Sequence, residues 1–139
     1  MNTINWGIIG CGDVTEIKSG PAFNKVPNSK LVAVMRRDAA KAADYARRHN
    51  VPRWYSDADK LINDPEVNAI YIATPPDSHE AYALAAINAG KPAYVEKPMA
   101  LNYAAAKNMA QAAAAKNIKV VVAHYRRDQK LFKKIKQLL

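Results

Sequence analysis

The chain has 139 residues, just under the length of one average domain, and its half apolar and one-quarter charged composition excludes an intrinsically disordered chain. Its apolar runs are only a few residues long, which excludes a membrane-spanning segment, and its single cysteine, Cys11, excludes a disulfide framework and favours a reduced, cytoplasmic protein. The net charge of +9 is uneven, because residues 116–139 hold eight basic residues against one acid and leave the preceding residues nearly balanced.

Short apolar runs alternate with helical patterns along the whole chain. The first half predicts, in order, a strand at Ile4–Ile9, a helix at Asp13–Phe23 broken near Gly20-Pro21, a strand at Lys30–Met35, a helix at Ala39–Arg48, a strand at Arg53–Tyr55 and a helix at Ala58–Ile62. The second half predicts a strand at Ala69–Ala73, a helix at Ser78–Ala89, a strand at Ala93–Val95, a helix at Tyr103–Lys116, a strand at Val120–Ala123 and a closing apolar stripe at helical spacing, formed by Leu131, Phe132, Ile135, Leu138 and Leu139. This alternation of strands that are apolar on both faces with helices predicts the α/β class, with a parallel sheet covered by helices on both faces and a single domain over residues 1–139.

Polar residues mark where several of these helices begin and end. Asp38, Asp57 and Asn102 each precede a helical pattern, where a side-chain oxygen can accept a hydrogen bond from the first turn. Gly90 and Pro92 follow the fourth helical pattern, as C-terminal stop signals do. These signals place the helix ends given above.

Residues 10–15, Gly-Cys-Gly-Asp-Val-Thr, join the first strand to the first helix. Gly10 permits a tight turn, Gly12 lets a pyrophosphate approach the backbone, and the free N–H groups at the helix start can hold the anion. Thr15 replaces the third glycine or alanine of the dinucleotide-binding fingerprint, and a Gly-x-Gly pair alone is often only a turn. The strand before the loop and the helix after it favour a cofactor site that includes Gly10, Gly12, Asp13 and Val14.

The second strand ends at residues 35–38, Met-Arg-Arg-Asp, where dinucleotide-binding folds commonly carry an acid that binds the adenosine ribose. Arg36 stands 24 residues after Gly12, close to the usual separation of about 20. An arginine there can pair with a 2′-phosphate and stack on adenine, so Arg36 and Arg37 favour NADP over NAD as the cofactor. The alternative is that both arginines are solvated and that Asp38 binds the ribose.

Two further motifs follow later strands. Residues 73–79, Ala-Thr-Pro-Pro-Asp-Ser-His, follow the fourth strand, and residues 94–98, Tyr-Val-Glu-Lys-Pro, close the fifth, so both lie at the edge where open α/β sheets bind ligands. Together with the glycine loop they resemble the Gfo/Idh/MocA family of NAD(P)-dependent oxidoreductases over essentially the whole chain. Residues 124–127, His-Tyr-Arg-Arg, are similar to the family's segment after the sixth strand. The resemblance implies a doubly wound, Rossmann-type parallel sheet with strand order 3-2-1-4-5-6.

The resemblance also implies functions for single residues. Lys97 is expected beside the nicotinamide, as the catalytic residue that positions or polarises the substrate and as a contact of the cofactor. Glu96 and the backbone of Thr74 and Pro75 are expected to line the nicotinamide ribose. Pro76 stands where the family often has asparagine, which removes one side-chain contact with the cofactor.

The histidines and the cysteine admit simpler interpretations. His79 belongs either to the cofactor site or to the packing and capping of its helix, and His124 either to the pocket or to packing at the sheet end. His49 is expected to be a solvated residue at a helix end. Three scattered histidines and Cys11 show no metal-ligand spacing, so no metal site is expected, and Cys11 is a packing residue rather than a nucleophile.

Members of the family are much longer than this chain, and their second domain, an open-faced β-sheet, carries the substrate pocket and an aspartate–histidine acid/base pair. The chain is therefore expected to be the N-terminal domain alone, a monomer or weak dimer that binds NADP or NAD with little hydride transfer of its own. The longer protein would transfer hydride between NAD(P) and a sugar, polyol or related hydroxy compound. The alternative is a cofactor-binding module without catalysis, which acts as a sensor or binds a partner.

The basic residues of 116–139 leave several interpretations open. A solvated helix face is the commonest reason for such a run, and an electrostatic docking surface is the more specific one. No nucleic-acid partner is expected, because neither a recognition motif nor interleaved aromatic residues accompany the charge. Where the family has apolar residues that pack against its second domain, this chain has polar ones, as an isolated domain or an always-exposed helix would: Asp128, Gln129, Lys130, Lys133, Lys134 and Lys136.

Overall fold

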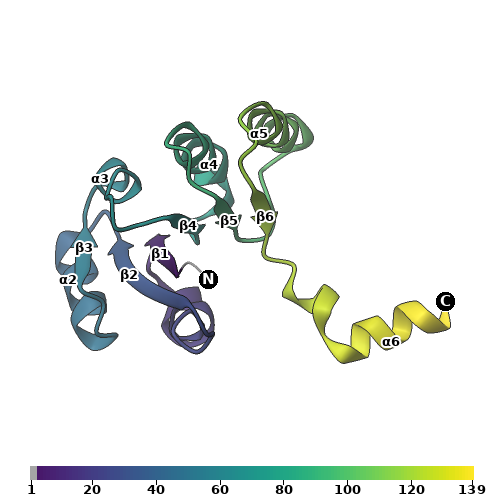
Figure 1. The fold of residues 1–139 in the computed structure, drawn as a ribbon, viewed down its shortest axis with the longest axis horizontal. Coiled ribbons are helices and arrows are strands. Elements are labelled where there is room, and N and C mark those ends of the chain that lie inside the picture. Colours follow the sequence, from purple (N-terminus) through teal and green to yellow (C-terminus); the bar gives the residue numbers. More distant parts are fainter. Residues whose placement is uncertain (1–2) are drawn as a thin grey trace.

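The computed structural model describes residues 3–139, which form one six-stranded sheet (Figure 1). All neighbouring strands are parallel and their order is β3-β2-β1-β4-β5-β6, which confirms the predicted doubly wound sheet. The strands are β1 (Ile4–Ile9), β2 (Ser29–Met35), β3 (Arg53–Tyr55), β4 (Ala69–Ile72), β5 (Ala93–Val95) and β6 (Val120–Val122). Because the strand order reverses between β1 and β4, a crevice forms at the carboxyl ends of these two strands.

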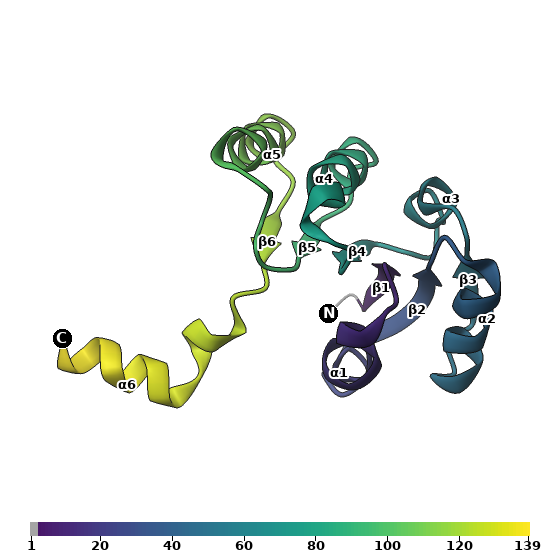
Figure 2. The same ribbon diagram turned by 180° about the vertical axis from the view of Figure 1, so that it is seen from behind.

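Helices cover both faces of the sheet. The helical segments are η1 (Thr15–Ser19), α1 (Gly20–Ala22), α2 (Ala39–Arg48), α3 (Ala58–Ile62), η2 (Pro76–Ser78), α4 (His79–Asn88), α5 (Tyr103–Ala115), η3 (Tyr125–Asp128) and α6 (Lys130–Leu138). Helices α3, α4 and α5 lie on one face, and α1 and α2 lie on the other (Figures 1 and 2). The arrangement confirms the prediction of helices on both faces.

The alternation of side chains along the strands divides the core into two layers. On β1, Ile9 packs in the layer that contains residues of α3, α4 and α5, whereas Ile8 packs in the layer that contains residues of α2. Both isoleucines are fully buried. Burial on both faces explains why the central strands have continuous apolar sequences rather than alternating ones.

The predicted helix caps are present. Asp38, Asp57 and Asn102 each accept a hydrogen bond from a backbone N–H two or three residues on, at 3.1, 2.9 and 2.9 Å respectively. Gly90 follows α4 with a φ of +73°, the left-handed conformation that glycine adopts most readily after a helix. These local interactions explain why the predicted boundaries after the first helix differ from the observed ones by at most one residue.

The first helix differs from its prediction, because it is not broken at Gly20-Pro21. It widens instead into a π-helical turn over Thr15–Ser19 and then continues to Ala22. Pro21 has no N–H, and its ring would meet the carbonyl group four residues earlier in a regular α-helix. In the wider turn the N–H of Gly20 donates to the carbonyl of Thr15, five residues earlier. The helix therefore continues past Pro21 without a break.

Helix α6 lies away from the sheet (Figures 1 and 2). None of its residues is buried, and Leu131, Phe132 and Ile135 remain 66%, 38% and 44% exposed. The closing apolar stripe therefore forms a helix, but that helix contributes nothing buried to the core. On the face of α1 and α2, no helix within residues 3–139 lies over β6 (Figure 1).

Candidate functional site

The chain turns sharply where β1 meets the first helix. Gly10 has a φ of +90°, and a Cβ at this position would overlap Thr74 and Ala73, which follow β4. The N–H groups of Gly10 and Cys11 both donate to the carbonyl of Met35, at 2.9 and 3.1 Å. The turn is therefore held between the ends of two neighbouring strands, and glycine is required at position 10.

Gly12, two residues on, faces open space. A Cβ built there meets no atom within 4 Å, while the carbonyl of Gly12 accepts the N–H groups of Thr15 and Glu16 at 2.9 and 3.2 Å. The N–H groups of residues 12–14 precede these first intrahelical bonds and so have no acceptor within the helix. A phosphate can approach the backbone here and accept from the helix start. The residues present therefore fit a dinucleotide's pyrophosphate.

A cavity of about 340 Å³ opens beside this loop and is surrounded by cationic side chains. The guanidinium of Arg36 donates to the carbonyl of Cys11 at 3.3 Å, which holds it against the glycine loop. Arg37 and Lys41 line the same cavity and are exposed. The structure also brings Gly10, Gly12, Thr74 and Pro75 to this cavity.

Asp38 is the acid that lines this cavity, and both of its oxygens face Lys41. Oδ1 accepts the backbone N–H of Lys41 at 3.1 Å, and Oδ2 lies 3.7 Å from its ammonium. The carboxylate therefore already caps α2, and a ribose hydroxyl would have to share it. The cavity has three cationic side chains and one carboxylate that is already hydrogen-bonded. This balance of charge favours binding of an anionic group over a neutral ribose.

A second cavity, of about 540 Å³, is lined by the first helix and by residues at the ends of β4, β5 and β6. The predicted residues Val14, Glu96 and Lys97 all line it. The hydroxyl of Tyr71 donates to Oε1 of Glu96 at 2.6 Å, and Oε2 accepts the backbone N–H of Lys97 at 3.1 Å. Lys97 is exposed, and its ammonium forms no ion pair with any of residues 3–139, so it can reach a molecule in the cavity.

His79 is almost fully buried and connects two loops. Its Nε2 lies 2.7 Å from the carbonyl oxygen of Thr74, and its Nδ1 lies 3.0 Å from that of Pro98. The ring thus ties the turn after β4 to the segment after β5. His79 and the exposed Asp13 line neither cavity, so a direct contact of either with a cofactor stays a prediction, and the contacts of His79 are those of a residue that packs between the two loops.

His49 is not the solvated residue that was expected. Its side chain is 20% exposed, its Nε2 lies 2.7 Å from Glu16, and its ring stacks near that of Tyr45 at 4.2 Å. The reason is that the end of α2 packs against the first helix, which supplies Glu16. His124 is exposed and lines a cavity rather than packing at the end of the sheet.

Cys11 is fully buried in the glycine loop, and burial raises the pKa of its thiol to about 11. A thiol that stays protonated is a poor nucleophile, in keeping with a packing residue. Residues 3–139 contain no cluster of three or more His, Cys, Asp or Glu that could hold a metal ion. Over the same residues, no helix is both long enough and apolar enough to cross a membrane.

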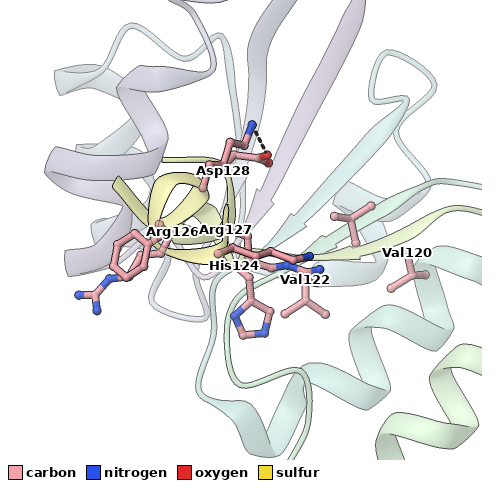
Figure 3. A pocket seen from close by; sticks show the side chains of 10 residues that line it. Val120, Val122, His124, Arg126, Arg127 and Asp128 are labelled. Atoms are coloured by element: carbon pink, nitrogen blue, oxygen red, sulfur yellow. Dashed lines mark ion pairs between the residues drawn. The ribbon is translucent and has the colours of Figure 1, made fainter. Parts of the chain in front are cut away.

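A large and open cavity of about 870 Å³ lies between β6 and α6 (Figure 3). Its polar lining is mainly basic, and the acid in it, Asp128, pairs with Lys133 at 3.0 Å. The valines of β6 and Phe132 of α6 form its apolar part. The basic residues of this lining thus lie beyond the β6 edge of the sheet, away from the glycine loop.

The sequence comparison decides the family. Residues 4–124 match the family described as "Oxidoreductase family, NAD-binding Rossmann fold". The chain belongs to the Gfo/Idh/MocA oxidoreductase family. It is therefore a nicotinamide-dinucleotide-binding Rossmann domain, as the sequence motifs predicted, and α6 lies beyond the matched residues.

Three relatives illustrate the match. Oxidoreductase P35 of Formosa agariphila is 57% identical over 136 residues, which are 98% of this chain and 42% of that protein. The scyllo-inositol dehydrogenase of Lactobacillus casei with bound NAD(H) and scyllo-inositol has a TM-score of 0.89 at 28% identity, covering 99% of this chain and 41% of that one. The biliverdin reductase of Synechocystis sp. PCC 6803 with biliverdin and NADP+ has a TM-score of 0.83 at 33% identity, covering 96% and 42%. The chain spans about two fifths of each relative.

Two residues of the site, Lys41 and Tyr71, lie outside the sequence motifs described above. Lys41 lines the cationic cavity, and its place three residues after the cap Asp38, one helical turn on, is a signal that points to it. Tyr71 lies within a buried strand, where alternation indicates its face of the sheet but not the partner of its hydroxyl. That partner, Glu96, is 25 residues away in sequence.

Proposed function

We propose that this chain binds a nicotinamide dinucleotide across the carboxyl edge of its sheet, as part of an oxidoreductase that transfers hydride between NAD(P) and a sugar, polyol or related hydroxy compound. The observation that carries the proposal is the open approach to Gly12 in a loop that borders both cavities. The loop lines the cationic cavity through Gly12 and the cavity beside Lys97 through Val14. A dinucleotide with its pyrophosphate at the helix start can place one half in each cavity.

The cationic cavity supports NADP as the preferred cofactor. Arg36 is held at the glycine loop by the carbonyl of Cys11, and Arg37 and Lys41 stand beside it. A 2′-phosphate would accept charge-assisted hydrogen bonds from these groups, whereas a free ribose would meet three cations and an acid already used as a helix cap. A neighbour at 33% identity binds NADP+ and another at 28% binds NAD(H), so the preference rests on this chain's own residues.

The cavity beside Lys97 supports the chemical end of the site. When bound, the nicotinamide ring supplies the position that gives or accepts hydride. The unpaired ammonium of Lys97 would donate a hydrogen bond to the oxygen of the substrate and favour charge there as the C–O bond order changes. Glu96 and the turn of Thr74 and Pro75 would line the adjoining ribose. The scyllo-inositol bound to the Lactobacillus casei relative supports a hydroxy compound as the substrate class.

The test is titration of the 139-residue chain with NADPH and with NADH, followed by tryptophan fluorescence. We expect both to bind and NADPH to bind more tightly. In competition, 2′,5′-ADP should displace NADPH more effectively than ADP does, because only the former carries the 2′-phosphate. Equal affinities, or tighter binding of NADH, would contradict the NADP preference. No binding of either cofactor would contradict the proposed function as a whole.

A further inference from the structure

Tyr71, in β4, is a fully buried residue whose hydroxyl reaches the cavity beside Lys97. Its ring meets that of Phe23, the residue after α1, edge-on with centroids 5.3 Å apart, and lies 5.4 Å from the ring of Tyr94 in β5. These contacts, together with the backbone of a central strand, leave the ring little freedom to move. The position of the hydroxyl is therefore set by the core of the protein.

The hydroxyl of Tyr71 forms a hydrogen bond with a side chain of the site, that of Glu96. It donates to Oε1 of Glu96 at 2.6 Å, a short distance that is typical of a charge-assisted O–H···O⁻ bond. The other oxygen of Glu96 accepts the backbone N–H of Lys97 at 3.1 Å. One carboxylate therefore joins the buried strand to the backbone of the residue that carries the exposed ammonium.

The chemistry of Tyr71 suits a hydrogen-bond donor rather than an acid or base. Burial, and then the hydrogen bond to the Glu96 carboxylate, raise the pKa of Tyr71 far above its ordinary value. The phenol therefore keeps its proton through the neutral and mildly alkaline range and continues to donate. Tyr45 is also almost fully buried, but its hydroxyl donates to the backbone carbonyl of Thr15 and so joins α2 to the first helix.

We infer that Tyr71 is a positioning residue of the dinucleotide site, which aims the Glu96 carboxylate at the nicotinamide half and, through it, holds the backbone of Lys97. This inference rests on the proposed function, because it assumes that Glu96 borders the bound cofactor. Packing alone does not need the hydroxyl, since phenylalanine would keep the same ring contacts. The hydroxyl is thus the part of Tyr71 that serves the site.

The experiment compares the Tyr71→Phe variant with the unchanged chain for two ligands. NADPH occupies both halves of the site, whereas 2′,5′-ADP occupies only the adenosine half. We expect Tyr71→Phe to weaken NADPH about fivefold to tenfold and to change 2′,5′-ADP by less than about twofold, as loss of one charge-assisted hydrogen bond at one end would do. Tyr55→Phe is the matched control, because Tyr55 lines neither cavity and its hydroxyl also donates to a carboxylate, that of Asp64, at 3.0 Å; it should change neither affinity.

A second variant tests whether Tyr71 acts through Glu96. In a chain that already carries Glu96→Gln, adding Tyr71→Phe should change NADPH affinity by less than about twofold, because the two residues belong to one interaction. If Tyr71→Phe fails to fold, Glu96→Gln alone must show the selective loss for NADPH. Equal weakening of both ligands, no weakening of either, or additive effects in the double variant would each overturn the inference. Failure of the unchanged chain to bind NADPH or NADH would instead overturn the proposed function.

Discussion

The hydroxyl of Tyr45 donates a hydrogen bond of 2.8 Å to the carbonyl of Thr15, which ties α2 to the first helix where that helix widens. The same carbonyl accepts the N–H of Gly20. A Cβ at Gly20 would overlap both the Thr15 oxygen and the Tyr45 hydroxyl, although the φ of −55° is ordinary for a helix. Space, and not backbone conformation, therefore requires glycine at position 20.

This relationship predicts whether replacing Gly20 raises or lowers the free energy of unfolding. Alanine normally stabilises a helix relative to glycine, but Gly20→Ala should lower the free energy of unfolding by about 1–3 kcal/mol, because a backbone carbonyl must move. Urea unfolding followed by circular dichroism measures it. Adding Tyr45→Phe should recover part of the loss by removing one of the two overlaps. A Gly20→Ala chain as stable as the unchanged one would show that the turn adapts freely.

Gly12→Ala provides the contrasting case. Its Cβ would meet no atom within 4 Å, so the free energy of unfolding should change by less than about 1 kcal/mol. The same methyl group would stand where the pyrophosphate has to approach the backbone, so NADPH affinity should fall about tenfold or more, which is about 1.4 kcal/mol. The fluorescence titration described above measures the affinity. Unchanged NADPH binding by a folded Gly12→Ala chain would place the phosphate elsewhere.

The cationic cavity beside the glycine loop predicts that substitutions in it change the affinities for NADPH and NADH unequally. Arg36→Ala should cost NADPH binding about 1–3 kcal/mol and leave NADH nearly unchanged, because the guanidinium is already held at the loop. Lys41→Ala should act in the same direction but by about 1 kcal/mol or less, since Lys41 is exposed. Lys60→Ala, at an exposed position of α3, is the control. If Arg36→Ala weakens NADH as much as NADPH, the arginine does not recognise the 2′-phosphate.

Most of the fold could be predicted because its signals are local. Strands buried on both faces are apolar throughout, and Asp38, Asp57 and Asn102 place their helix starts by bonds to the next turn. The motif residues could also be placed at the correct edge, because the carboxyl ends of parallel strands meet there. The residue types within each short segment thus determine much of the architecture.

The remainder depends on partners that are distant in sequence. The π turn is bonded to Tyr45, thirty residues beyond Thr15, and the hydroxyl of Tyr71 finds Glu96 on another strand. The stripe of α6 indicates an amphipathic helix but carries no signal for what its apolar face contacts. Likewise His49 resembles a solvated helix-end residue until the first helix brings Glu16 against it.

Glu16 predicts a pH dependence of stability. Arg48 donates to its two oxygens at 2.8 and 2.6 Å and His49 lies 2.7 Å away, and the hydrogen bonds from Arg48 are the main reason that the pKa of Glu16 falls from 4.5 to about 2. Because the folded-state pKa is the lower one, this stabilisation is complete above about pH 4.5 and is lost as pH falls toward 2. Glu16→Gln should therefore flatten the fall of the melting temperature in that window.

The matched control for this prediction is Glu66→Gln. Glu66 is exposed and forms no ion pair with any of residues 3–139, so the substitution should leave the acid limb of the profile unchanged. Parallel profiles for Glu16→Gln and the unchanged chain would show that solvent and the neighbouring charges already screen the pair with Arg48.

Lys97 predicts a separation of turnover from cofactor affinity. Its ammonium borders the cavity without an ion pair, while its backbone N–H is held by Glu96, so the side chain is free to act on a substrate oxygen without being needed to hold the dinucleotide. In an active form of the protein, Lys97→Ala should lower kcat by about 100-fold or more and change the Kd of NADPH by less than about threefold. Lys25→Ala, at an exposed position that lines neither cavity, should leave kcat within about threefold. If Lys97→Ala instead weakens NADPH and leaves kcat intact, the ammonium binds the cofactor, and the group that polarises the substrate has to be sought elsewhere.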